Sequence, residues 1–451
     1  MKAISRLLVL LTVFLTACTV PPSLAPTRQP TSQPTLTPLI QNVSQPTNQQ
    51  TTQPTPPLPL LSPAPHPLLL AHYMPWYQTP SESGYWGWHW TMDHFNPAEK
   101  DANGRPELAS HFTPLTGPYD SRDDALLEYQ VMLMKLSGIH GVIVDWYGME
   151  DFWDYGTLNA STNKLFTYIQ RAGMYFAICY EDRTVKNMLD NGHLPADARL
   201  THGQEVMAYL QDTWFQSPNY LKYTDPTGET RPVLFVFGNP PYFTRTDWAT
   251  LFDGLTPAPF LITEDDPLPP VAPFSYPWPP MGLSLGGELT PNALNGYLTA
   301  FYHKAENWDY LVAGAFPGFH DIYAEAGVGN SYGYLDAQNG DTFRLTLQTA
   351  LAADPDVIQL ITWNDYGEGT TLEPTEEYRY QYLEILQDTH RTLAPAFPYT
   401  PDDLTLPLQI YTLRKQFKTD AALNLLLDEA VAALLAGHLD EARAILTRFH
   451  P

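Results

Sequence analysis

Cysteine is nearly absent from this chain of 451 residues, which has only Cys18 and Cys179. Cys18 ends an apolar N-terminal run, whereas Cys179 lies in a predicted strand, so we expect no structural disulfide between them. Stability must therefore come from packing. The 44% of hydrophobic residues are enough to build a sizeable core.

Positive charge is also scarce. The chain has 24 Lys and Arg against 49 Asp and Glu, which gives a formal net charge of -25. Such a charge opposes binding to phosphate backbones, so we expect no nucleic acid partner.

Several familiar motifs are missing. The 13 histidines include no H-E-x-x-H or other paired-ligand spacing, so we predict no transition-metal site, although calcium held by surface acids stays open. No Gly-rich phosphate loop follows the first predicted strand, and we expect no cofactor. Residues 282–286 match the G-x-S-x-G nucleophile elbow, but prolines precede Ser284 where an apolar strand is required, so we interpret the match as chance.

The N-terminal apolar run is too short to span a membrane. Lys2 and Arg6 precede apolar residues 7–15, the layout of an export signal. Residues 15–18, Leu-Thr-Ala-Cys, resemble the lipobox of bacterial lipoproteins, which implies cleavage before Cys18 and diacylation of its thiol. A plain secretory signal is the alternative. We expect an exported protein, lipid-anchored to the outer face of the cell membrane or cell envelope.

Residues 19–66 are rich in Pro, Thr and Gln. Such a composition buries too little apolar surface to offset the entropy lost on ordering, so we predict a disordered linker after the signal peptide of residues 1–18.

Eight apolar runs follow, and each ends in polar or aromatic residues before a segment with helical spacing. They cover residues 68–77, 141–148, 175–182, 232–238, 259–265, 274–278, 310–316 and 357–361. Continuous apolar strands that alternate with helices indicate a parallel sheet covered by helices. We predict a (β/α)8 TIM barrel over residues 67–400, with a doubly wound open sheet as the alternative. Prolines crowd the sixth run, so we expect it to be short or irregular.

Residues 401–451 form the predicted C-terminal extension. Two helical segments, 420–437 and 439–449, resemble half of a tetratricopeptide-like hairpin. Because a solenoid needs several repeats, we expect a small helical cap docked on the barrel.

Acids and aromatic residues dominate the strand ends, which form the active-site face of such a barrel. Asp365 and Glu368 follow the last run, three residues apart, where Gly367 and Gly369 permit a tight turn. Two carboxylates are the minimum for cleaving a glycosidic bond, and Trp363 offers a ring for a sugar face. Further acids at other strand ends are Asp182, Glu264, Asp265 and Asp321.

The segment Trp363-Asn364-Asp365-Tyr366-Gly367-Glu368 resembles the WNDYGE segment of glycoside hydrolase family 71, the α-1,3-glucanases. Together with HYMPWY at residues 72–77, the stretch TWNDYGEGTTLEP also resembles family 99, the endo-α-mannosidases, whose segment reads WNEWxEGTxxEP. The family 99 resemblance implies that Glu368 is the general acid. Asp365 stands where that family has a Glu that deprotonates the sugar's 2-hydroxyl; the shorter Asp leaves action through water or as a nucleophile open.

The resemblance and the barrel pattern together predict a set of substrate-binding residues, for which ordinary core packing is the alternative. They are His72, Tyr73, Trp76, Tyr77, Asp145, Trp146, Tyr147, Tyr180, Glu181, Trp278, His320, Trp363, Asn364 and Glu373. We predict a glycoside hydrolase that cleaves an α-linked oligo- or polysaccharide, an α-glucan or an α-mannan. A non-catalytic, cell-surface carbohydrate-binding lipoprotein is the alternative.

Overall fold

A computed structural model describes residues 57–62 and 64–449. The predicted signal peptide, Cys18 and most of the predicted linker lie outside these residues. Leu58 is described: its backbone N–H donates to the carbonyl oxygen of Arg171 at 3.0 Å, and its side chain packs against the core. The folded part of the chain thus begins upstream of Pro67, where the sequence placed the boundary. No helix in the described part is long and apolar enough to cross a membrane.

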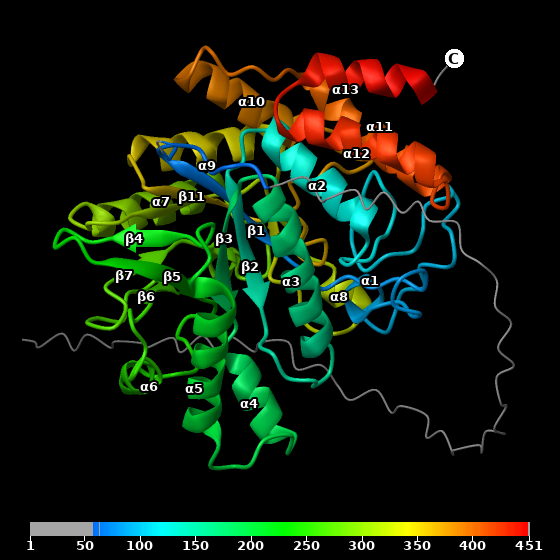
Figure 1. Ribbon diagram of the computed structural model, residues 1–451. Helices are drawn as coiled ribbons and strands as arrows, with labels where there is room; N and C mark the ends of the chain where they lie inside the picture. Colours follow the sequence, from blue (N-terminus) through cyan, green and yellow to red (C-terminus); the bar gives the residue numbers. More distant parts are fainter. Residues whose placement is uncertain (1–56, 63, 450–451) are drawn as a thin grey trace, which may run out of the picture. The chain divides into compact units, whose positions relative to one another are not determined.

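The centre of the molecule is a nearly closed barrel of parallel strands (Figure 1), in the neighbour order β7-β6-β5-β3-β2-β1-β11-β8. These strands are β1 (Leu68–Tyr73), β2 (Gly141–Trp146), β3 (Tyr175–Tyr180), β5 (Thr230–Val236), β6 (Phe260–Glu264), β7 (Phe274–Tyr276), β8 (Val312–Ala315) and β11 (Val357–Leu360). Each lies within one of the eight predicted runs, apart from the first two residues of β5. The predicted barrel is therefore confirmed, and β7 is short, as its prolines suggested.

The barrel seam lies between β7 and β8, the two ends of the hydrogen-bonded strand order. Pro277 follows β7 directly and has no backbone N–H to donate across the seam. A Cβ atom on Gly314 of β8 would lie 2.9 Å from the Pro277 ring and 3.2 Å from its carbonyl oxygen. Glycine is thus needed where the proline packs against β8.

Helices surround the barrel, and most of them follow the predicted apolar spacing. The longer ones are α2 (Asp124–Leu136), α3 (Tyr155–Arg171), α5 (Arg199–Leu210), α7 (Pro291–Ala305), α9 (Asp341–Ala352) and α10 (Gln381–Leu393). Shorter helices are α1 (Trp88–Thr91), α4 (Arg183–Asp190), α6 (Arg245–Leu251) and α8 (Tyr323–Ala326). Outside the barrel ladder, β4 (Lys222–Thr224) pairs antiparallel with β5, and β9 (Phe319–His320) pairs with β10 (Tyr334–Leu335).

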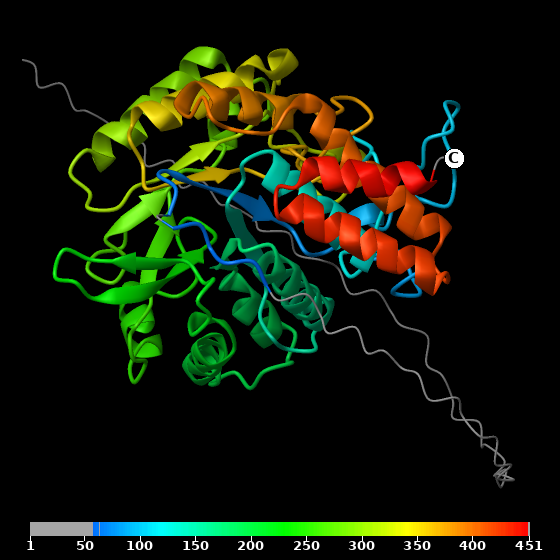
Figure 2. The ribbon, with the colours of Figure 1, turned by 45° about the horizontal axis from the view of Figure 1, so that its top comes forward.

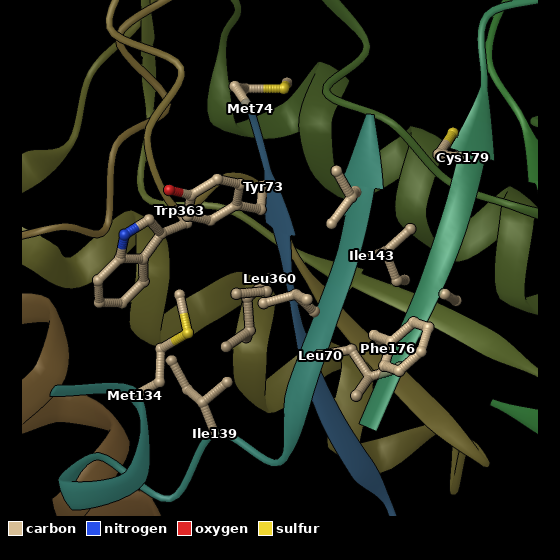
Figure 3. Packing of buried hydrophobic residues seen from close by; sticks show 14 of the residues in the cluster. Leu70, Tyr73, Met74, Met134, Ile139, Ile143, Phe176, Cys179, Leu360 and Trp363 are labelled. Carbon is tan, nitrogen blue, oxygen red and sulfur yellow. The ribbon is translucent and has the colours of Figure 1, made fainter. Parts of the chain in front are cut away.

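The apolar core fills the space between the barrel and its helices. Figure 3 shows part of it, where Tyr73, Leu360 and Trp363 lie on the same side as Met134 and Ile139, at the end of α2. Successive side chains of a strand point to opposite faces, so the strand residues that alternate with these outward-pointing ones face the barrel interior. This alternation decides which strand-end residues reach the active-site face.

The C-terminal extension is helical, as predicted, but it has an additional helix. The described part contains α11 (Leu406–Gln416), α12 (Ala421–Leu435) and α13 (Leu439–Leu446). The prolines before residue 408 indicated no helix there, yet Pro407 stands in the first turn of α11, where a missing N–H costs nothing. Both α11 and α12 lie against α2 (Figures 1 and 2).

Candidate active site

The turn after β11 carries the predicted carboxylate pair. The peptide bond between Ile361 and Thr362 is cis, and the N–H of Asp365 donates to the Thr362 hydroxyl at 2.7 Å. The N–H of Glu368 then donates to Asp365 Oδ1 at 2.9 Å, which closes the turn. Both acids consequently lie in one hydrogen-bonded loop.

Backbone hydrogen bonds fix this turn to the segment around β9. The N–H of His320 donates to the Glu368 carbonyl oxygen at 2.8 Å, and the N–H of Ile322 donates to that of Gly367 at 3.0 Å. Gly369 has a φ of +67°, and a Cβ there would lie 2.7 Å from the His320 carbonyl oxygen. Gly367 has no positive φ, so of these two predicted turn glycines only Gly369 has a backbone conformation that favours glycine.

The two carboxyl groups have different proton affinities. Burial raises the pKa of Asp365 to about 6, and hydrogen bonds from the N–H groups of Glu368 and Gly367 oppose this rise. The pKa of Glu368 is raised well above its ordinary value by burial, then by the negative charges of Asp365 and Asp321. Glu368 therefore keeps its proton at a pH at which Asp365 has lost its own.

Three more acids reach the same end of the barrel. The pKa of Asp145 on β2 is raised by burial and by the charges of Glu181, Asp365 and Glu368, which places these groups near one another. Burial raises the pKa of Glu181 and that of Glu264 to about 8. Glu264 Oε2 accepts the N–H of Gly238 at 2.8 Å. Glu264 was predicted as a strand-end acid but not as a binding residue. It is the last residue of β6, a position equivalent to that of Glu181 directly after β3.

Aromatic rings follow several of the barrel strands, at their carboxyl ends. Trp76 stacks on His89 with ring centres 4.1 Å apart, and Tyr147 lies 6.1 Å from Trp76. Trp278 meets the His72 ring edge-on at 4.9 Å. His89 was not predicted, because its segment between β1 and α2 has no strand pattern to indicate its position.

Four of the predicted binding residues point away from the barrel interior, toward the outer helices. Tyr73, Trp146, Tyr180 and Trp363 are fully buried between the strands and the outer helices. The Tyr73 hydroxyl donates to Gln130 Oε1 on α2 at 2.7 Å, and Trp146 Nε1 donates to Asn159 Oδ1 on α3 at 3.1 Å. Trp363 lies in the apolar layer of Figure 3 and offers no surface to a sugar. These rings pack the core, because the alternate residues of each strand point outward.

Asn364, Tyr77 and Glu373 were also predicted to bind substrate, and their polar atoms are hydrogen-bonded within the protein. Asn364 accepts the Met74 N–H at 2.9 Å and donates to the Met74 carbonyl oxygen at 3.0 Å, while the Tyr77 hydroxyl donates to the Asn364 carbonyl oxygen. Glu373 accepts hydrogen bonds from three side chains, Gln130, Tyr119 and Tyr366. This network joins the turn after β11 to the loop after β1.

Two further predicted residues have clear places in the structure. The half-buried His320 ring stacks on His111 with centres 3.6 Å apart, and its backbone supports Glu368. Ser284 lies in a 3-10 turn, Met281–Ser284, and its hydroxyl is within 2.7 Å of the Met281 carbonyl oxygen. That geometry is not a strand-to-helix elbow, so it gives no support to a serine nucleophile.

Comparisons with known proteins agree with this architecture. No family model matches the chain. It is 25% identical over 344 residues to glycoprotein endo-alpha-1,2-mannosidase of Mus musculus, covering 68% of this chain and 67% of that protein. It is 23% identical over 358 residues to the corresponding endo-alpha-1,2-mannosidase-like protein of Homo sapiens, covering 70% and 71%.

A solved structure, the family 99 endo-alpha-mannosidase of Bacteroides thetaiotaomicron in complex with bis-tris-propane, matches the fold with a TM-score of 0.51 at 19% identity. The match covers 73% of this chain and 98% of that one. The sequence similarity and the shared barrel lead to the same assignment. The chain is a glycosidase whose sequence and barrel are similar to those of the family 99 endo-alpha-mannosidases.

Proposed function

We propose that this glycosidase hydrolyses α-mannosidic linkages within mannose-containing glycans, with Glu368 as the general acid and Asp365 as the base. The observation that carries the roles is the turn that holds two carboxyl groups of different proton affinity at the end of β11. The α-mannosidase names of its relatives favour mannose over the α-glucan that the family 71-like hexapeptide left open.

The proposed reaction uses the charge state that its surroundings give to each acid. Protonated Glu368 gives its proton to the glycosidic oxygen as the bond from that oxygen to the anomeric carbon breaks, so the leaving sugar departs as an alcohol. In one route, ionised Asp365 takes a proton from the water that attacks the anomeric carbon. In the other, it takes the proton of the sugar's own 2-hydroxyl, whose oxygen bonds to the anomeric carbon to form a 1,2-anhydro sugar, and water then opens that ring. Both routes need Asp365 ionised and Glu368 protonated at the start.

The test compares Glu368→Gln and Asp365→Asn with the wild type on a panel of α-mannans and α-glucans. An amide cannot donate or accept the proton as the acid does, so each variant should lose about 10²- to 10⁴-fold in kcat, with glycan binding retained. Glu376→Gln is the matched control, because Glu376 lies in the same loop but is exposed and pairs with Arg105 at 2.9 Å. It should keep the wild-type rate.

Two outcomes would contradict the proposal. If Glu368→Gln turned over glycan as fast as Glu376→Gln, the role of Glu368 would be wrong. If the folded wild type bound α-mannan without cleaving any member of the panel, the carbohydrate-binding alternative would replace the hydrolase.

We also propose that the enzyme is exported and lipid-anchored through Cys18. Support comes from the basic and apolar residues 1–17 and the Leu-Thr-Ala-Cys sequence that ends at Cys18. A Cys18→Ser variant expressed in a bacterial host should move from the detergent phase to the aqueous phase on detergent partitioning. Equal partitioning of variant and wild type would contradict the anchor.

A further inference from the structure

Three potential metal ligands meet inside the barrel, one from each of three adjacent strands. Asp145 on β2 and Cys179 on β3 are register partners, so their side chains lie on the same face. His72 on β1 pairs with Ile143, two residues before Asp145, and points to the same interior. Figure 3 shows Cys179 near the carboxyl end of β3.

The polar atoms of this group are buried and poorly satisfied. His72, Asp145 and Cys179 are 0%, 2% and 0% exposed. Among the described residues, neither nitrogen of His72 nor either oxygen of Asp145 has a hydrogen-bond partner. Cys179 Sγ has only a long contact of 3.6 Å to the Tyr276 hydroxyl, which also reaches the Val236 carbonyl oxygen at 3.0 Å. Buried polar groups are normally paired, so this cluster calls for a ligand.

The spacing of the donor atoms suits one ion. One nitrogen, one carboxylate oxygen and the sulfur all lie within 4.8 Å of one another. They therefore surround a centre that is at most about 2.8 Å from each atom, and small side-chain rotations would shorten this to the 2.0 to 2.3 Å of zinc ligands. A thiolate and an imidazole select zinc or a similar transition metal over magnesium or calcium.

We propose that His72, Asp145 and Cys179 form a binding site for Zn²⁺ or a similar divalent transition metal. The carboxylate and the thiolate would balance the two charges of the ion in a buried place, and the neutral imidazole would complete three protein ligands. A fourth position remains for a water molecule or another small ligand. The site uses neither Asp365 nor Glu368, so it stands or falls independently of their proposed roles.

The proposal gives two predicted binding residues a new role as metal ligands. From the sequence, His72 and Asp145 were predicted to bind the substrate, and no transition-metal site was expected. No spacing motif indicated one, because the ligands are separated by long stretches of chain and meet only across neighbouring strands.

Metal content and cobalt spectroscopy test the site on the full-length chain. Protein freed of metal with a chelator and then dialysed against Zn²⁺ should retain about one ion per chain. Titration with Co²⁺ should give the near-ultraviolet band of a cobalt-thiolate bond and saturate at the same stoichiometry.

The two cysteines of the sequence provide a matched pair of variants. Cys179→Ser should lose the cobalt-thiolate band and bind Zn²⁺ at least about 100-fold more weakly, since loss of an outer-shell partner alone costs about 10- to 100-fold. Cys18→Ser should bind like the wild type. Asp145→Asn should weaken Zn²⁺ affinity in the same way but keep the cobalt-thiolate band when Co²⁺ is in excess.

Circular dichroism of each variant establishes that it is folded before metal is added. A folded wild type that retains no zinc and gives no cobalt-thiolate band would overturn the proposal. So would a band that disappears in Cys18→Ser and persists in Cys179→Ser. If Cys179→Ser did not fold, the Asp145→Asn comparison would decide, and wild-type affinity in that variant would equally overturn the site.

Discussion

Asp365 and Glu368 occupy one turn, yet their surroundings give them different proton affinities. Asp365 accepts backbone N–H groups that favour its charged form, whereas the main neighbours of Glu368 are other acids. The pH dependence of kcat/KM should report this difference. Activity should fall as the pH drops through about 6, where Asp365 gains a proton, and fall again at higher pH, where Glu368 loses its own.

The loss of activity at high pH offers a sharper measurement of the interaction between Asp365 and Glu368. Because the negative charge of Asp365 raises the pKa of Glu368, the residual activity of Asp365→Asn should decline at a lower pH than that of the wild type. Glu376→Gln should leave both limbs unchanged. An unshifted alkaline limb in Asp365→Asn would mean that the two groups do not interact.

Substitution of two tryptophans distinguishes a side chain that packs the core from one that is predicted to contact the substrate. Trp363 is fully buried beside α2, whereas Trp278 lies in the barrel end against His72. Trp363→Phe should lower the free energy of unfolding by about 1 to 3 kcal/mol and leave KM unchanged. Trp278→Phe should raise KM several-fold. Thermal melts and steady-state kinetics of both variants test this, and a raised KM for Trp363→Phe alone would reverse the assignment.

At the scale of an element, the turn after β11 depends on one glycine more than on the other. A Cβ at Gly369 would meet the backbone oxygen of His320 at 2.7 Å in a left-handed conformation, whereas a Cβ at Gly367 would meet the flexible end of Met92 at 3.0 Å. Gly369→Ala should therefore destabilise the protein by at least about 1 to 2 kcal/mol and reduce kcat by displacing Glu368.

Gly367→Ala is the matched control for this prediction. Met92 can move aside, so its melting temperature and kcat should stay close to those of the wild type. Denaturant unfolding and initial rates measure both effects. Equal losses in the two alanine variants would show that the conformation of Gly369 is not what holds the turn.

At the scale of the whole molecule, the C-terminal helices are joined to the barrel by a buried ion pair. Arg414 on α11 donates to both oxygens of Glu128 on α2, at 3.0 and 3.2 Å, and both side chains are almost wholly covered. Burial raises the pKa of Glu128 although Arg414 opposes the rise. Arg414→Ala should cost about 3 to 5 kcal/mol of unfolding free energy, because it leaves a buried carboxylate unpaired.

Replacing both partners provides the control for the ion pair. Glu128→Leu combined with Arg414→Met fills the same space without charge, so it should cost much less than Arg414→Ala alone. Denaturant unfolding of the three proteins gives the comparison. A double variant as unstable as the single one would mean that the loss comes from packing rather than from an unpaired charge.

Much of this molecule was determined by the sequence itself. Strand and helix patterns are local and repeat along the chain, so eight apolar runs were sufficient to predict a (β/α)8 barrel. The turn proposed to be catalytic was equally local: Asp365, Glu368 and the glycines are consecutive or nearly so. Helix α11 was not predicted, because a proline in the first turn of a helix cannot be distinguished in the sequence from a proline that prevents a helix.

Only the tertiary structure decided what each strand end faces. Tyr73, Trp146, Tyr180 and Trp363 match a sugar-binding pattern but pack under the helices, since neighbouring residues of a strand point to opposite sides. His72, Asp145 and Cys179 show the converse, because nothing in their spacing links them and the strand register brings their donor atoms together. Composition and periodicity determine the elements, whereas contacts between distant residues exist only once the strands are placed side by side.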